Sequence, residues 1–132
     1  MSTLWRLLVG GALLALVGCA ADKRKTSAKI LQEVGASGLR QEAAVFYKEL
    51  FVAPTGRYFL PKEKQWPRTF QSFEPLQVRA YSDGFSLAMR AERGIEEGIY
   101  VVPAGMDNVP REGRNARFEK IDDGIYWYRF NE

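Results

Sequence analysis

Hydrophobic and polar positions along the chain form three successive patterns. Residues 7–18 are an unbroken run of Leu, Val, Ala and Gly. Residues 30–51 carry apolar side chains at helical spacing, whereas the chain from Leu76 onward alternates between apolar and polar positions as β-strands do. The patterns therefore predict an apolar leader, then a helix, then a sheet.

The helical pattern predicts one amphipathic helix. Its apolar stripe, at spacings of four, three and four residues, consists of Leu39, Ala43, Phe46 and Leu50. One face of this helix must be buried. Gly35 and Gly38 interrupt the earlier turns, and each glycine costs about 1 kcal/mol relative to alanine inside a helix, so Ile30–Val34 could form a separate short helix. The helix is therefore expected to be interrupted near Gly35.

Residues 67–73 predict a short helical segment that precedes the sheet. A proline suits the first helical turn, and Trp66, Phe70 and Phe73 share one face at spacings of four and three. We interpret these aromatic side chains as core residues that cap one end of the sheet, in preference to an exposed platform for a ligand.

Asp83 and Gly84 separate two strand-like segments, Leu76–Ser82 and Phe85–Glu92, and predict a hairpin with a type I′ turn. The expected opposing pairs, which are all apolar, are Ala80 with Leu87, Val78 with Met89, and Leu76 with Ala91. The other face of this hairpin is expected to carry Arg79, Tyr81, Ser86, Ala88 and Arg90.

A short motif occurs twice in the last third of the chain. Ile95–Val101 and Ile121–Trp127 both read Ile, acid, acid, Gly, Ile, Tyr and an apolar residue. Acid-Gly dipeptides are common turn formers, so we interpret each copy as an acidic turn that leads into a strand. The predicted strands cover residues 99–103 and 125–130, with a long loop over 104–115.

The register of the last hairpin stays open at this point. A two-residue turn would pair Ile121 with Tyr126, whereas a four-residue turn would pair Phe118 with Trp127. The chain of 132 residues is long enough for one domain. The prediction is a single α+β domain over 30–132, in which the N-terminal amphipathic helix packs on an antiparallel meander of about five strands.

The apolar leader has the features of an export signal. Arg6 is its only charge, and its apolar run is shorter than the ~20 residues that a membrane-spanning helix needs. The run ends in Leu16-Val17-Gly18-Cys19, which resembles the lipobox of bacterial lipoproteins. That motif begins with an aliphatic residue, which is followed by a small or aliphatic residue, a small residue and an obligatory cysteine.

The resemblance implies a diacylglyceryl group on the Cys19 thiol, cleavage between Gly18 and Cys19, and acylation of the new amino terminus. Residues 1–18 would then be the signal peptide and 19–29 a lipidated flexible tether. Two or more acyl chains anchor a protein stably in a membrane. The second residue after the cleavage site is Ala20, whereas an aspartate at that position would resemble the inner-membrane retention signal of enteric bacteria. We therefore expect the protein to be anchored at the periplasmic face of the outer membrane, in preference to the outer leaflet of the inner membrane.

Composition excludes several classes of chemistry. The chain has no histidine and one cysteine, so it offers neither an imidazole base nor an internal disulfide or a CxxC site. Its 19 basic and 16 acidic side chains are too evenly balanced for a nucleic-acid partner. The sequence contains neither Ser-x-x-Lys nor Gly-x-Ser-x-Gly. We therefore expect a non-enzymatic protein with no metal and no cofactor.

Tyrosines in the predicted strands are the main candidate binding residues. If the helix covers one face of the sheet, the other face would show Tyr81, Tyr100, Tyr126 and Tyr128, with Arg79 and Arg90 nearby. Tyrosine and arginine are enriched in contact surfaces. In the alternative interpretation these strands are central and covered on both sides.

The loop over 104–115 suggests a second group of candidates. Arg111, Arg114 and Arg117 recur every third residue, and guanidinium groups bind phosphates through two hydrogen bonds. Such a group could bind a lipid headgroup or an acidic partner, although a solvated loop would have the same composition.

Together these features predict a lipid-anchored, non-catalytic envelope protein that binds another envelope component, such as a protein partner, through an aromatic sheet face. The alternative is a lipoprotein that binds a small ligand, a glycan or a lipid headgroup, which would need a pocket lined by Trp66, Phe70 or Trp127. A hydrolase would need a carboxylate or a lysine buried beside a serine.

Overall fold

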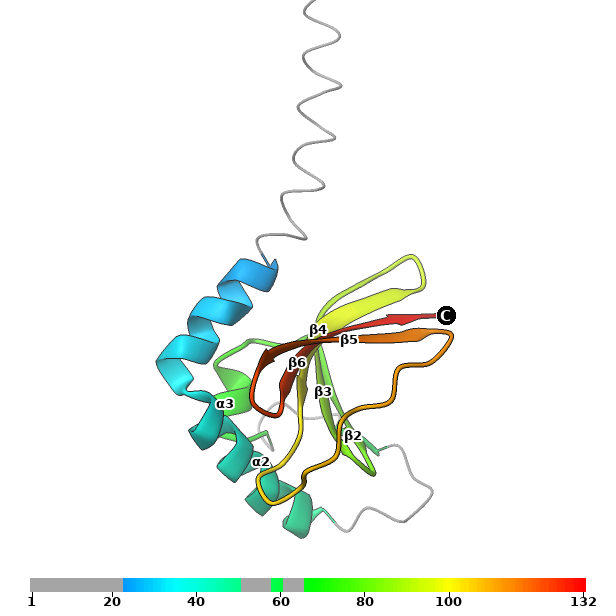
Figure 1. Ribbon diagram of the computed structural model, residues 1–132. Helices are drawn as coiled ribbons and strands as arrows, with labels where there is room; N and C mark the ends of the chain where they lie inside the picture. Colours follow the sequence, from blue (N-terminus) through cyan, green and yellow to red (C-terminus); the bar gives the residue numbers. More distant parts are fainter. Residues whose placement is uncertain (1–22, 51–57, 61–65) are drawn as a thin grey trace, which may run out of the picture.

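The computed structural model describes residues 23–50, 58–60 and 66–132, and the leader, Cys19 and the proposed cleavage site lie outside these ranges. The helices lie along one side of a curved antiparallel sheet (Figure 1), so the predicted α+β class is confirmed. After a helix over 23–34, the elements are α2 (Ala36–Glu49), β1 (Tyr58–Leu60), α3 (Arg68–Gln71), β2 (Gln77–Tyr81), β3 (Gly84–Glu92), β4 (Ile95–Val101), β5 (Ala116–Asp122) and β6 (Ile125–Asn131).

The N-terminal helical region is divided as the sequence predicts. Gly35 has a φ of 84° and separates the helix over 23–34 from α2. The expected interruption at Gly38 is wrong, since Gly38 lies inside α2. Leu39, Ala43 and Phe46 on α2 are buried, which confirms the predicted apolar stripe. None of the described helices combines the length and the apolar composition that crossing a bilayer requires.

The prediction of a flexible tether is wrong for residues 23–29, which are helical and packed on the sheet. Ser27 is buried, and its hydroxyl donates to the carbonyl oxygen one turn earlier. The guanidinium of Arg24 lies 2.6 Å from the Glu119 carboxylate and 5.9 Å from the ring centre of Trp127. These contacts could not be predicted from the polar composition of the segment, because they involve strands that lie about a hundred residues further along the chain.

The sheet contains six strands in the order β1-β2-β3-β4-β6-β5, and every neighbouring pair is antiparallel. One strand more than expected is present, since β1 pairs with β2 at the edge of the sheet. The simple meander also ends at β4, because β6 lies between β4 and β5. The connection between β4 and β5 carries the chain to the outer position, from which β6 returns.

The turn between β2 and β3 lies one residue earlier than predicted. Tyr81 pairs with Gly84, so Ser82 and Asp83 form the turn and Gly84 begins β3. A side chain at Gly84 would place its Cβ 2.5 Å from the carbonyl oxygen of Val101, which explains the glycine without a turn. Each predicted pair shifts by two residues, and the apolar face is unchanged because side chains alternate with a period of two.

The two copies of the acidic motif form different structures. Asp123 and Gly124 form the turn between β5 and β6, as predicted, and Gly124 has a φ of 67°. In the first copy, the prediction of a turn is wrong, since the motif lies inside β4. The preceding turn is formed by Arg93 and Gly94, with φ values of 52° and 76°. Positive φ at both positions is typical of a type I′ turn.

A bulge decides the register of the last hairpin. The turn has two residues, but Asp122 pairs with Ile125 and Lys120 pairs with Tyr126, so that Ile121 is an extra residue in β5. Neither of the registers considered from sequence is therefore present. The bulge lets Ile121 pack against the helix-side core while Asp122 stays exposed.

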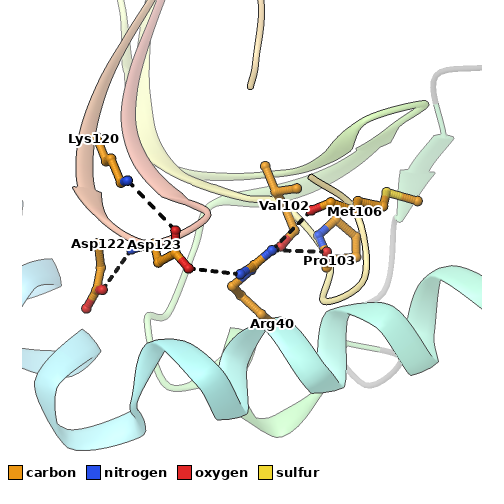
Figure 2. A network of polar contacts seen from close by, with 7 residues as sticks. All are labelled: Arg40, Val102, Pro103, Met106, Lys120, Asp122 and Asp123. Carbon is orange, nitrogen blue, oxygen red and sulfur yellow. Dashed lines mark hydrogen bonds and ion pairs between the residues drawn. The ribbon is translucent and has the colours of Figure 1, made fainter. Parts of the chain in front are cut away.

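Arg40 on α2 connects the helix layer to the long connection after β4 (Figure 2). Its Nε donates to the carbonyl oxygen of Val102 at 2.9 Å, and its Nη2 donates to the carbonyl oxygen of Met106 at 3.2 Å. Its Nη1 lies 3.7 Å from the Asp123 carboxylate in the turn between β5 and β6. The side chain of Arg40 therefore connects α2 to two separate loops.

We expect Arg40→Met to lower the free energy of unfolding by about 2–4 kcal/mol, because hydrogen bonds to a charged group are lost and carbonyl oxygens are left without a donor. Arg114→Met is the matched control, since Arg114 is an exposed arginine. Urea unfolding followed by circular dichroism measures both variants. Equal midpoints for the two variants would contradict this role of Arg40.

Candidate functional site: the concave face of the sheet

The four candidate tyrosines lie on the same face of the sheet, opposite the helices, as predicted. Tyr100, Val102, Tyr126 and Tyr128 form a buried cluster, against which Tyr81 and three other apolar residues pack. The three others are Met106, Phe118 and Phe130. The helix-side core is a separate cluster on the opposite face.

Most of this tyrosine cluster is covered by the protein itself. The sheet curves so strongly that Tyr81 of β2 reaches Phe130 of β6, with ring centres 6.3 Å apart. From β5, Phe118 packs edge-on against Tyr100 at 5.1 Å. The expectation of an exposed tyrosine surface fails for Tyr100, Tyr126 and Tyr128, since each is at most 8% exposed. These strands are covered on both sides.

The two most deeply buried phenols donate hydrogen bonds to carboxylates. The hydroxyl of Tyr100 bonds to Asp83, and that of Tyr128 donates to Oε2 of Glu96 at 2.8 Å. Burial, assisted by these carboxylates, raises the pKa of Tyr100 and of Tyr128 above the ordinary value for a phenol. Both side chains are therefore neutral hydrogen-bond donors that fix the concave face in one arrangement.

Glu96 is the centre of a polar cluster at the edge of this face. Besides Tyr128, it accepts a hydrogen bond from the Gln77 amide at 2.7 Å and lies 3.4 Å from the Arg79 guanidinium. The side chains of Glu96 and Arg79 are only 12% and 24% exposed. Arg79 thus lies where the sequence predicts. Glu96 was missed as a site residue, because its motif was interpreted as a turn.

Arg90 lies on the opposite face from the tyrosines, contrary to the prediction. It forms ion pairs with Glu97 at 3.4 Å and with Glu92 at 3.6 Å. The reason is a bulge in β3 between Ala88 and Arg90, which adds one residue opposite Gly98 and reverses the alternation of the side chains beyond it.

Two open grooves lie along the concave face. The first, here called the hairpin groove, has a volume of about 700 Å³, and its lining includes Gln77, Arg79, Tyr81, Arg93, Glu96 and Phe130. The second, here called the loop groove, has a volume of about 430 Å³, and its lining includes Tyr81, Asp83, Asn108, Val109, Arg111 and Phe130. Tyr81 and Phe130 line both grooves.

The predicted arginine cluster does not converge on one site. Arg111, Arg114 and Arg117 are all exposed, and only Arg111 lines the loop groove. Arg114 and Arg117 line neither groove. The arrangement therefore offers a single guanidinium at the concave face from this loop.

The aromatic side chains of the short helical segment belong to the helix-side core. Trp66, Phe70 and Phe73 are buried, as is Trp127, which confirms their interpretation as core residues. Trp66 also borders a hollow of about 340 Å³ beside α2, but neither Phe70 nor Trp127 lines it. Of the three residues expected to line a carrier pocket, only Trp66 therefore borders this hollow, beside Phe46 of α2.

Among the described residues, the buried serine of the sheet is inaccessible and no metal-binding cluster is present. Ser86 pairs with Arg79 and with Tyr100 in the sheet, and it is 1% exposed, so that a substrate cannot reach its hydroxyl. Across ranges 23–50, 58–60 and 66–132, no group of three or more His, Cys, Asp or Glu side chains could hold a metal ion.

Comparisons with known proteins identify no relative of this chain. The chain matches no protein-family model, no curated protein and no solved structure. The concave face, with its two grooves, and the lipobox resemblance of residues 16–19 are thus the two features from which a function is argued.

Proposed function

We propose that this protein is a lipid-anchored, non-catalytic envelope protein that binds another envelope component through the concave face of its sheet. The lipobox resemblance at Cys19 supports the anchor. The observation that carries the binding role is the pair of grooves that meet at Tyr81 and Phe130 on the face left open by the helices.

The polar groups of this face suit binding better than catalysis. Glu96 is held by Arg79, Gln77 and Tyr128, so its carboxylate is paired with a cation and both of its oxygens already have partners within the protein. A general base needs a lone pair that is free to accept a proton from a substrate. Fixed polar groups around an aromatic floor instead provide a preformed binding surface.

The burial pattern restricts which residues can contact a partner. Three tyrosines of the concave face are too buried to contact a partner directly, namely Tyr100, Tyr126 and Tyr128. The residues that can contact a partner are those along the grooves, such as the half-buried Tyr81 and the 70% exposed Val109. The proposed contact surface is therefore the rim of the tyrosine cluster.

Site-specific crosslinking in bacterial cells tests this proposal. A photoreactive benzoylphenylalanine would replace Tyr81 or Val109 on the concave face, or Val45 on α2 as the control, because Val45 is 60% exposed on the opposite layer. We expect light-dependent adducts of constant mass from positions 81 and 109 but not from 45. Absence of an adduct at both concave positions, or the same adducts at all three, would contradict the proposal.

A small-ligand role for the same face is the second candidate. The hairpin groove, at about 700 Å³, has the size of typical small-molecule sites. Both candidates place the ligand on one surface, so the chemistry of that surface decides which ligand it fits.

A further inference from the structure

We propose that the component bound by the concave face is a linear glycan strand that lies across both grooves. This inference rests on the proposed function and specifies its ligand. Four features of the grooves support it: the pairing of their strands, their balance of charge, their exposed chemical groups and their continuity.

Where the grooves meet, at Tyr81 and Phe130, a peptide cannot bind by adding a strand, because the free edge of the sheet on this side belongs to β5. Tyr81 and Phe130 belong to β2 and β6, and each of these strands has a partner on both sides. β6 is paired along its length with β4 and β5, and β1 covers residues 78–80 of β2, whereas addition of a peptide strand requires a free sheet edge. A ligand in the grooves must be recognised by side chains.

The charge of the grooves does not favour a polyanion. In the hairpin groove, Arg79 and Glu96 neutralise each other, and Arg93 is outnumbered by Glu92 and Glu132. Ligands rich in phosphate need a concentration of positive charge, such as several converging arginines. A phosphorylated headgroup or an acidic polymer is accordingly a poor fit, and an uncharged ligand fits better.

The exposed groups match the surface of a sugar. Exposed side-chain amides line both grooves, Asn115 in the hairpin groove and Asn108 in the loop groove. Gln77 and Asn131 also line the hairpin groove, but they are half-buried and hydrogen-bonded to Glu96 and Arg129. Side-chain amides both donate and accept hydrogen bonds, as sugar hydroxyls do. A pyranose ring also has a face of C–H groups, which removes apolar surface from water when it packs on an aromatic ring such as that of Tyr81.

The continuity of the grooves indicates a linear ligand. The hairpin groove reaches Arg93 and Gly94 at one end of β3, whereas the loop groove reaches Ser82 and Asp83 at its other end. These two turns lie at opposite ends of β3 in Figure 1. A strand of 9 residues is about 30 Å long. Because Tyr81 and Phe130 line both grooves, a chain of several sugar rings can occupy the two together.

Calorimetric titration of the full-length protein in detergent micelles tests this inference, with the dimer, tetramer and hexamer of N-acetylglucosamine as probes. We expect the hexamer to bind at least about tenfold more tightly than the dimer, a difference of about 1.4 kcal/mol. Tyr81→Ala and Asn115→Ala should each weaken binding of the hexamer several-fold. Asn115 is exposed, so its replacement is expected to leave the fold intact. Val45→Ala is the matched control and should bind as the wild type does.

The outcomes separate the two proposals. Affinity that does not change with oligomer length would overturn the linear ligand, and unaltered binding by both concave variants would overturn the site. If no probe binds while position 81 still crosslinks to a protein in cells, the glycan inference fails and the proposed function remains. If no probe binds and positions 81 and 109 give no adduct, both proposals fail.

Discussion

Replacing Gly98 with alanine is expected to lower the free energy of unfolding by more than about 3 kcal/mol and to leave little folded protein. A Cβ at Gly98 would lie 1.9 Å from the carbonyl oxygen of Leu87 and 3.0 Å from the amide nitrogen of Met89. Both obstacles are backbone atoms, so no side-chain rotation can relieve the overlap. Overpacking of a well-packed interior already costs 1–3 kcal/mol when only side chains must move.

Gly38→Ala provides the matched control for this prediction. Gly38 lies inside α2, where a Cβ would meet nothing within 4 Å, and alanine is favoured over glycine in a helix by about 1 kcal/mol. The same substitution should therefore stabilise the protein at Gly38 and disrupt it at Gly98. Urea or thermal unfolding followed by circular dichroism measures both effects. A wild-type midpoint for Gly98→Ala would show that β3 and β4 are not as close as described.

Replacing Cys19 with alanine is expected to abolish lipidation. We predict that the wild-type protein from a bacterial host incorporates labelled palmitate and begins at an acylated Cys19, whereas Cys19→Ala shows background label because no thiol is left for diacylglyceryl transfer. Each buried methylene of an acyl chain contributes about 0.8 kcal/mol to membrane binding, so the change in anchoring is large.

The matched control for the anchor is Ala20→Ser, which changes a neighbouring small residue and leaves the thiol in place. It should incorporate the label as the wild type does. Mass spectrometry of the N-terminal peptide measures acylation and cleavage together. A wild-type protein with an unmodified Cys19 and residues 1–18 still attached would contradict the proposed anchor and the outer-membrane location that depends on it.

The faces of the elements were predictable from the sequence, because periodicity survives errors of register. The apolar stripe of α2 and the common face of Tyr81, Tyr100, Tyr126 and Tyr128 both follow from spacing alone. Even the shifted turn between β2 and β3 preserves this face, because the shift is two residues.

Contacts that depend on strand register were not predictable. Arg90 was assigned to the wrong face because a bulge adds one residue before it, and Glu96 was missed because an acid-acid-Gly sequence fits a strand as well as a turn. Glycine has two uses in this chain: positive φ at Gly94 and close backbone approach at Gly98. The sequence alone does not distinguish them.

The role of Arg40 was not predicted either. Its position on the polar side of the helical pattern indicates exposure, yet it binds carbonyl oxygens more than 60 residues further along the chain. The curvature of the sheet was also not predictable, although it decides that three of the four tyrosines are buried.

The position of the helical residues 23–34, close to Cys19 in the sequence, limits how far the protein can extend from a bilayer. With a lipid on Cys19, as proposed, only residues 19–22 lie between the acyl chains and the helical residues 23–34. Four residues span at most about 14 Å even when fully stretched. The folded part would then stay beside the headgroups and diffuse in two dimensions, and it would meet only molecules that come to the membrane surface.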